Sequence, residues 1–434
     1  MKKDLILFAA SLLVAFFILE GAVRLLFPDN PLPYRLNDAK RFIPEIGVLK
    51  QPNQTVTEVA PCFEIQDIKF NDAGFRATPE PANPKYRIAV LGDSYVEAMQ
   101  IPNGLDVSSR LGDMLDARIF NEGIGGANII KEFSIYANST RAKQPNIVLL
   151  MLYGTNDILD SNCKFLDRKA KLLGLDTREI CAIPAEPIAS IRAPGPPADL
   201  APEVEPRRPK SPREMMKSWC RSCDLLYGIA RQVGYVADGD LNFVTGEQIN
   251  LPESSLEGAI RSEVRDAWLI TKVMLGKFRD QVRADNAQLV IVLIPNHSQI
   301  SPTWKKEYQS YFGQQPPEGY DPGWHEQRLL DISRELEIPT VALSEHFRRY
   351  QADQRLPFPN LSYRCDGHWN PLGHFIAASV VAEFLAGKGY IAVDKPDDFV
   401  SARQSERRQS ARRVIGDLAY DQIFGRGIYR PAAN

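Results

Sequence analysis

Residues 87–95 read RIAVLGDSY, an apolar run that stops at a Gly-Asp-Ser turn. A continuous apolar stretch of this kind is typical of a strand that is buried on both faces of a parallel sheet. The turn places the Ser94 hydroxyl at the carboxyl end of that strand, the edge where open α/β sheets bind ligands. Ser94 is therefore the first candidate nucleophile, although a serine at this point also fits a helix N-cap.

An alternating α/β pattern extends outward from this turn. Strands are expected at residues 87–91, 117–121, 146–153, 288–295 and 339–343. Helical spacing is expected at residues 107–115, 129–141, 257–284, 326–337 and 372–386. Five strands separated by helices predict a parallel sheet with helices on both faces.

The regions around this pattern are less regular. Residues 28–85 are rich in proline and turn residues, and we interpret them as a stalk and the lead-in to a domain that spans 86–390. An insertion interrupts the domain at about 160–255, where nine prolines within 184–212 exclude a regular helix or central strand. It is interpreted as a long ordered loop or a flexible lid. The polar tail at 391–434 has arginines at near-helical spacing, which fit a solvated helix face or a contact with anionic headgroups or a charged glycan.

The N-terminus begins with a basic and then an apolar segment. Lys2 and Lys3 precede residues 5–19, of which Ser11 is the only polar member. This pattern over residues 1–27 predicts a membrane anchor or signal segment. An uncleaved anchor is favoured because no small-x-small cleavage site is visible; a cleaved signal and a buried core helix are the alternatives. The positive charges predict a cytoplasmic N-terminus, with the rest of the chain outside the cytoplasm.

Composition argues against several other classes of protein. The net charge of −2 gives no global field that indicates nucleic-acid binding.

An even number of cysteines in an exported chain suggests disulfides, with Cys163 and Cys181 able to close one insertion loop. The lone CxxC at 220–223 lacks the second pair that a zinc site needs, and the histidines lack paired spacing. No metal and no cofactor are expected.

Three further polar blocks follow the serine turn, each at a predicted strand end or in a loop. They are residues 121–126 (NEGIGG), 154–157 (GTND) and 366–370 (DGHWN). The carboxyl ends of parallel strands meet at one edge of a sheet, so all four blocks can converge there.

In this order the four blocks resemble the SGNH (GDSL) hydrolase family, over roughly residues 71–386 outside the insertion. The NDAGFR segment at 71–76 and an anchor that carries Glu20 and Arg24 are similar to those of exported members. Many members space their acid and base as Asp-x-x-His, whereas the Asp-x-His-Trp-Asn of this chain resembles the extracytoplasmic polysaccharide-modifying branch. The resemblance implies a three-layer αβα sandwich around a flavodoxin-like, five-stranded parallel sheet.

The resemblance also implies a catalytic triad. A serine hydroxyl is a poor nucleophile at neutral pH, so an imidazole must take the proton of Ser94 during attack, and His368 is the expected base. An acid must fix the tautomer of that ring and stabilise its charge, and Asp366 fits this role.

The tetrahedral intermediate needs hydrogen-bond donors for its oxyanion. By resemblance these are the backbone N–H groups of Ser94 and Gly126 and the side-chain amide of Asn156. Gly125 is the alternative to Gly126, because glycine suits a loop whose backbone approaches the substrate closely.

Other residues near these blocks receive weaker assignments. His297 is a candidate substrate-binding residue, and Trp369 either stacks on a sugar ring or packs in the core. His374 is expected to pack nearby on its helix. Asp93 and Asp157 are expected to stabilise turns.

The sequence therefore predicts a serine esterase or O-acyltransferase that acts through an acyl-Ser94 intermediate. The expected substrate is an acylated carbohydrate, with O-acetyl esters of a bacterial envelope glycan favoured, or another ester. The catalytic domain is expected to be periplasmic, held at the inner membrane by the N-terminal helix near envelope polysaccharide machinery, or secreted if that segment is cleaved. A lipid-directed esterase of the lysophospholipase kind, and a non-catalytic glycan-binding or scaffold subunit, are the alternatives.

Overall fold

The computed structural model describes residues 34–43, 46–60, 63–154, 156–159, 258–312, 315–354, 361–363 and 366–409, together with residues 11, 15–18, 21, 161, 256, 413, 414 and 416. The proline-rich insertion, all six cysteines with their expected disulfides, and most of the expected N-terminal anchor lie outside these residues. Within the described part of the chain, no helix has both the length and the apolar character needed to cross a membrane.

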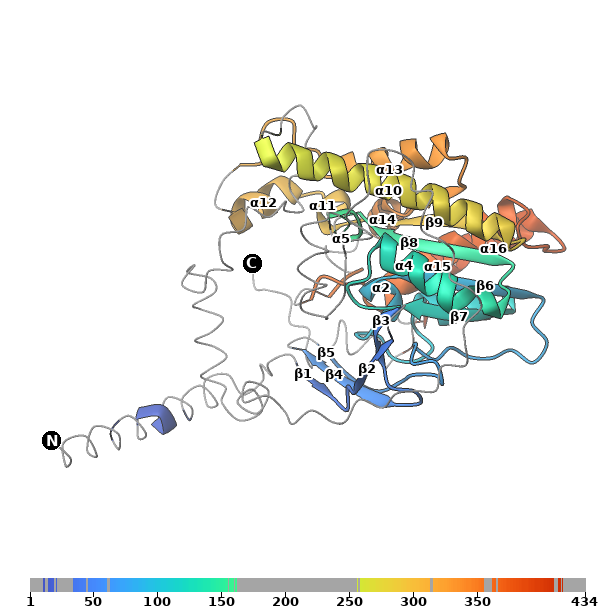
Figure 1. The fold of residues 1–434 in the computed structure, drawn as a ribbon, viewed down its shortest axis with the longest axis horizontal. Helices are drawn as coiled ribbons and strands as arrows, with labels where there is room; N and C mark the ends of the chain where they lie inside the picture. The colour runs from blue at the N-terminus through green and yellow to red at the C-terminus, as the bar shows by residue number, and fades with distance from the viewer. Residues whose placement is uncertain are drawn as a thin grey trace.

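A parallel sheet in the order β10-β9-β8-β6-β7 forms the centre of the fold (Figure 1). Its strands are β6 (Tyr86–Gly92), β7 (Ala117–Gly123), β8 (Ile147–Tyr153), β9 (Gln288–Ile294) and β10 (Thr340–Ala342). With β6 as the first strand, the spatial order is 2-1-3-4-5, which is the flavodoxin-like arrangement. The predicted fold class is confirmed.

Helices cover both faces of this sheet. Successive residues of each strand point to opposite faces, so each strand contributes apolar side chains to both. Ile88 and Val90 of β6 belong to one apolar cluster, which contains α3 (Val107–Leu115) and α15 (Pro371–Gly387). Ala89 and Leu91 belong to the other, which contains α4 (Ile129–Asn138), α10 (Gly258–Ala284) and α13 (Trp324–Glu335). The other helices in the described part of the chain are α2 (Ser94–Glu97), η1 (Thr140–Lys143), α5 (Asn156–Leu159), α11 (His297–Ile300), α12 (Trp304–Phe312), α14 (Ser344–Gln354) and α16 (Pro396–Arg407).

Residues 28–85, interpreted as a stalk and the lead-in to the domain, contain antiparallel strands where a stalk was expected. An antiparallel sheet in the order β1-β4-β5 is built from β1 (Tyr34–Leu36), β4 (Thr55–Ala60) and β5 (Phe63–Lys69), beside a hairpin of β2 (Lys40–Ile43) and β3 (Gly47–Lys50). Val56 and Ile68 are fully buried in the same cluster as α15. The alternating burial of FEIQDIK in β5 is typical of a strand with one wet face, so the segment is part of the domain.

The arginine-rich tail begins with helix α16, which packs on α15 (Figure 1). Arg407 donates to the Ser379 hydroxyl at 2.7 Å and to the Glu383 carboxylate at 3.1 Å. Arg403 pairs with Glu406 at 2.6 Å. These two arginines therefore bind acceptors of the protein itself.

Candidate active site

The nucleophile candidate lies at the carboxyl end of β6, where α2 begins at Ser94. Asp93 is the N-cap of this short helix, and its carboxylate accepts a hydrogen bond from the Tyr95 N–H at 2.9 Å. Asp93 thus stabilises the turn, as expected. Capping is done by Asp93, so the Ser94 hydroxyl is not the N-cap.

Ser94 contacts a histidine and, through it, an aspartate. The Ser94 Oγ lies 2.7 Å from His368 Nε2. The other ring nitrogen, Nδ1, lies 2.7 Å from Asp366 Oδ2. The three groups predicted to be nucleophile, base and orienting acid are therefore aligned in hydrogen-bond contact.

The Asp-x-His spacing works because the chain reverses at the residue between the acid and the base. Gly367 has φ +83°, a left-handed conformation that suits glycine. Its N–H donates to the Tyr363 carbonyl at 2.8 Å, and the Tyr363 N–H donates to the His368 carbonyl at 2.8 Å. Asn370 then caps α15 by accepting from two N–H groups of the first turn. This tight loop holds Asp366 and His368 just before the N-cap of the buried helix α15.

The electrostatics of the loop favour a charged imidazole ring. Burial lowers the pKa of His368, but the hydrogen bond and the charge of Asp366, aided by Asp93, raise it by more. The net pKa of His368 is above its ordinary value. The ring is therefore suited to accept the proton of Ser94 and to hold it as an imidazolium ion.

The antiparallel sheet lies close enough to the triad to affect it. The charge of Arg35, on β1, opposes the rise in the pKa of His368. Glu58, on β4, pairs with Arg35, and burial together with the charge of Asp366 raises the Glu58 pKa. Residues that the sequence assigned to a stalk therefore border the site.

Aromatic rings pack against the imidazole ring of His368. The Tyr95 ring lies 4.8 Å from the His368 ring and 5.0 Å from the rings of Tyr153 and Trp369 (centroid distances). Trp369 is only 1% exposed and also packs on Phe347. The prediction that Trp369 stacks on a sugar ring is corrected: its ring is in the core, the alternative that the sequence left open.

The glycine-rich block after β7 is tied to the nucleophile helix. The Asn121 amide donates to the Val96 carbonyl at 2.8 Å, and a Cβ at Gly123 would lie 2.3 Å from the Glu97 nitrogen. The Gly125 N–H donates to Glu97 Oε2 at 2.9 Å. Because that N–H is committed to Glu97, Gly126, at φ +70°, stays the predicted oxyanion donor.

The third block follows β8 and forms the start of α5 at Asn156. The Asn156 side chain lies outside the described part of the structure, so its role stays a prediction. The Asp157 carboxylate accepts from the Tyr153 N–H at 2.6 Å and stabilises the turn, as expected. Gly154 is required here, because a Cβ would lie 1.8 Å from Cδ2 of the buried His325.

The remaining histidines have distinct surroundings. His297 begins α11 after β9, and its Nε2 lies 3.2 Å from Glu307 Oε2; its substrate role stays a prediction. His374 is fully buried, and burial lowers its pKa to about 3. Its Nδ1 accepts from the Val107 N–H at 3.1 Å, which links α15 to α3, so the expected packing role is confirmed. Burial likewise lowers the pKa of His325 to about 4.

The NDAGFR segment at residues 71–76 has a structural role that its sequence does not disclose. The Asn71 side chain accepts from the Ala73 and Phe75 N–H groups, at 3.0 Å each, and so shapes the turn. Arg76, fully buried, donates to the carbonyls of Glu97, Ala98 and Ile101, which follow the nucleophile. Only the position of this motif before the serine block hinted at such a link.

Among the described residues, no three His, Cys, Asp or Glu side chains are grouped so that they can hold a metal ion.

Residues 266–419 match a family described as "SGNH hydrolase-like domain, acetyltransferase AlgX". The matched range contains Asp366 and His368, and Ser94 precedes it. No curated protein matches the chain.

Two solved structures show a distant likeness. LAE5, an alpha/beta hydrolase enzyme from the metagenome of Lake Arreo, Spain, is 12% identical, with a TM-score of 0.36 over 71% of this chain and 98% of that chain. A catalytic mutant of Axe2, an acetylxylan esterase from Geobacillus stearothermophilus, is 9% identical, with a TM-score of 0.35 over 70% of this chain and 96% of that chain.

The five-stranded parallel sheet, with helices on both faces, defines the chain as an α/β protein. More closely, residues 266–419 are similar to the SGNH hydrolase-like domain of acetyltransferase AlgX.

Proposed function

We propose that the protein is a serine esterase or O-acyltransferase that acts on O-acetyl esters of an envelope glycan through an acyl-Ser94 intermediate. The single observation that carries the reaction type is the pair of 2.7 Å contacts from Ser94 Oγ to His368 Nε2 and from His368 Nδ1 to Asp366 Oδ2. The family description, which names an acetyltransferase, supports the acetyl group. The glycan is supported by the Asp-x-His-Trp-Asn block at 366–370, which resembles the polysaccharide-modifying branch.

In the first half-reaction the Ser94 oxygen attacks the acyl carbon while its proton moves to His368 Nε2. Asp366 holds the ring in the tautomer with Nδ1 protonated and stabilises the imidazolium ion. The tetrahedral oxyanion binds the Ser94 and Gly126 N–H groups and the Asn156 amide. Collapse breaks the bond to the sugar oxygen, which leaves with the proton of His368 as a hydroxyl and leaves the acyl group on Ser94.

In the second half-reaction an acceptor hydroxyl loses its proton to His368 Nε2 and attacks the acyl-Ser94 carbon. The ester bond to Ser94 breaks, and the Ser94 oxygen recovers the proton from the ring. Water as acceptor gives hydrolysis, and a sugar hydroxyl gives acetyl transfer. The triad chemistry is the same for both, so the acceptor decides between esterase and transferase.

The proposal includes a location outside the cytoplasm. Its support is the basic and apolar pattern of residues 1–27, which fits an anchor that leaves the domain on the far side of the inner membrane. Protease protection in spheroplasts tests this part, because a periplasmic domain is digested when protease is added from outside.

Labelling with a fluorophosphonate probe tests the reaction type. We expect the wild-type chain to be labelled and the Ser94→Ala variant to be unlabelled, with equal thermal midpoints. A folded wild type that does not react contradicts the enzyme and leaves a glycan-binding or scaffold subunit.

The substrate needs a second set of measurements. Turnover of p-nitrophenyl esters is expected to fall as the acyl chain grows beyond acetyl, whereas a lipid-directed esterase prefers the longer chains. Acetyl transfer to oligosaccharides, measured against acetate release, then separates the transferase from the esterase.

A further inference from the structure

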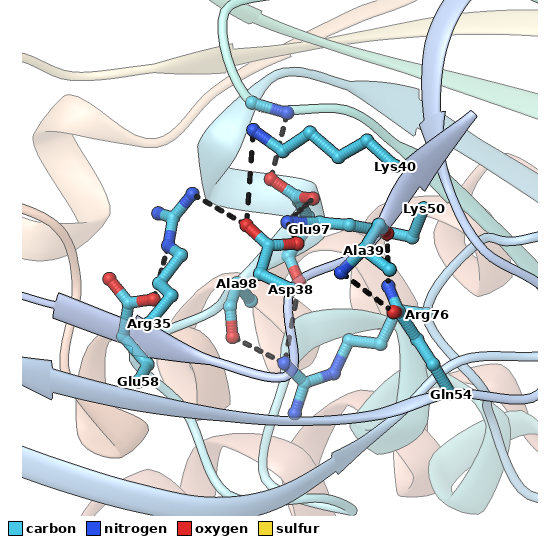
Figure 2. Close-up of polar contacts among 11 residues, drawn as sticks. Arg35, Asp38, Ala39, Lys40, Lys50, Gln54, Glu58, Arg76, Glu97 and Ala98 are labelled. Carbon is cyan, nitrogen blue, oxygen red and sulfur yellow. Dashed lines mark hydrogen bonds and ion pairs between the residues drawn. The ribbon is translucent and has the colours of Figure 1, made fainter. Parts of the chain in front are cut away.

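Glu97 is a buried carboxylate that the proposed reaction does not use. It lies three residues after the nucleophile, at the end of α2, with its side chain 8% exposed. Its Oε2 accepts the Gly125 N–H at 2.9 Å, and its Oε1 lies 3.7 Å from the Lys50 ammonium (Figure 2). A buried carboxylate that is tied to a backbone N–H and a cation is held in one orientation.

The cation comes from the N-terminal strands. Lys50 ends β3 and is 7% exposed, and its Nζ lies 2.5 Å from Asp38 Oδ1 (Figure 2). Asp38 also faces Lys40 at 3.8 Å and Arg35 at 3.9 Å. Positive and negative side chains therefore alternate from Arg35 on β1 to Glu97 beside the glycine loop. Removing one member of a buried ion pair is destabilising, because it leaves the other charge buried without a partner.

The backbone of the glycine loop fits closely against this carboxylate. A Cβ at Gly125 would lie 2.7 Å from Glu97 Oε2, so a side chain here would displace the carboxylate from its present position. The next residue, Gly126, is in the left-handed conformation at φ +70°. A contact that fixes Gly125 therefore sets the direction of the peptide that carries the predicted oxyanion donor.

We infer that Glu97 is a positioning residue that fixes the Gly125–Gly126 peptide for oxyanion binding, and that Lys50 of β3 and Asp38, between β1 and β2, hold Glu97 in place. This inference rests on the proposed function, since it gives the glycine loop a task in that reaction. Lys50 and Asp38 then act on the active site through Glu97.

Variants of the full chain test this arrangement by kcat, KM and amide hydrogen exchange over residues 121–127. Glu97→Ala and Lys50→Met are expected to lower kcat for p-nitrophenyl acetate by about 10²-fold, with KM almost unchanged, because a small misplacement of a donor costs about that much. Exchange at Gly125 and Gly126 is expected to rise in both. Glu97→Gln, which keeps the shape and an acceptor, recovers part of kcat and covers the case that Glu97→Ala fails to fold.

Lys40→Met is the matched control. It removes another cation from Asp38, but Lys40 is 52% exposed and pairs with Asp38 rather than Glu97. We expect wild-type kcat and exchange from this variant. The same result from Lys50→Met, or wild-type exchange in both Glu97→Gln and Glu97→Ala, overturns the inference.

The two proposals fail in different ways. If the wild type releases acetate in a Ser94-dependent manner and the Glu97 and Lys50 variants match it, only the positioning role is wrong. If the wild type has no Ser94-dependent turnover, the proposed function fails, and the catalytic purpose of the Glu97 contact falls with it.

Discussion

Asp366 and His368 are separated by a single residue, yet His368 Nδ1 lies 2.7 Å from Asp366 Oδ2. The reversal at Gly367, φ +83°, makes this contact between near neighbours in the sequence. Because Nε2 of the same ring lies 2.7 Å from Ser94 Oγ, the loop at residues 366–368 places both the proposed base and the proposed orienting acid beside Ser94. The shortened spacing therefore keeps the geometry of a serine hydrolase.

Asp366→Asn is expected to lower kcat by about 10⁴-fold while KM changes little. The amide can stabilise the wrong ring tautomer, with Nδ1 unprotonated, and it cannot neutralise the imidazolium ion. Steady-state kinetics on p-nitrophenyl acetate measure the loss. A fall of less than tenfold in a folded variant contradicts the role of Asp366 as the orienting acid.

The pH dependence follows from the raised pKa of His368. The base must be neutral, so kcat/KM is expected to rise with pH through a midpoint above the ordinary value for histidine. In Asp366→Asn the midpoint is expected to move to lower pH, because burial, which lowers the pKa, is then no longer opposed by the Asp366 carboxylate. Profiles of kcat/KM against pH for both proteins check this, and a midpoint that moves upward contradicts it.

The same group contributes to stability with a definite sign. A folded-state pKa above the unfolded value means that the folded chain binds the proton more tightly. The stabilisation from His368 is fully present below the unfolded pKa and is lost as pH rises through the folded pKa. The thermal midpoint of wild type minus that of His368→Gln is therefore expected to shrink over that interval. A difference that grows as pH rises contradicts this assignment.

The central sheet was predictable because its strands are buried on both faces. A run such as QLVIVLI in β9 carries that signal in its own residues, and the predicted strand differs from the observed one only at its end. The antiparallel sheet was not predictable in the same way, because β1 has only three residues and its partner β4 is distant in the sequence. Left-handed residues such as Asn37 and Asn53 read locally as turns.

The residues of the site also differ in whether a local sequence motif indicates their role. Ser94, His368 and Asp366 stand in short motifs whose residue types disclose the chemistry. Glu97 and Lys50 have no such motif, because their arrangement exists only once separate segments pack together. Local sequence cannot show that pairing.

Gly154→Ala is expected to lower the free energy of unfolding by about 1–3 kcal/mol, the usual cost of forcing an extra group into a packed site. The new Cβ would lie 1.8 Å from the His325 ring, so the ring or the strand end must move. Urea unfolding measures the change. His325→Ala in the same chain is expected to recover part of the loss.

Gly387→Ala is the matched control for that substitution. Nothing lies within 4 Å of a Cβ at Gly387, at the end of α15. Alanine favours the helix, so a gain of up to about 1 kcal/mol is expected. Equal effects at the two glycines contradict the claim that His325 closes the space beside Gly154.

Arg76→Met is expected to lower the free energy of unfolding by about 3–5 kcal/mol, because it leaves a buried charge unpaired. Arg76 is 0% exposed, and its Nε lies 3.5 Å from Oδ2 of Asp106, which is also 0% exposed. Its loss also frees the carbonyls of Ala98 and Ile101 after the nucleophile helix. Urea unfolding, followed by the rate of probe labelling in the folded protein, measures both effects.

Arg118→Met separates this loss from the general removal of an arginine. Arg118 pairs with Glu80, whose side chain is 66% exposed, and an exposed ion pair contributes about 0–1 kcal/mol. A large effect at Arg76 and a small one at Arg118 are therefore expected. If the two variants unfold at the same urea concentration, Arg76 does not fix the segment behind Ser94. The structural role left to the NDAGFR segment is then the local turn that the Asn71 side chain shapes.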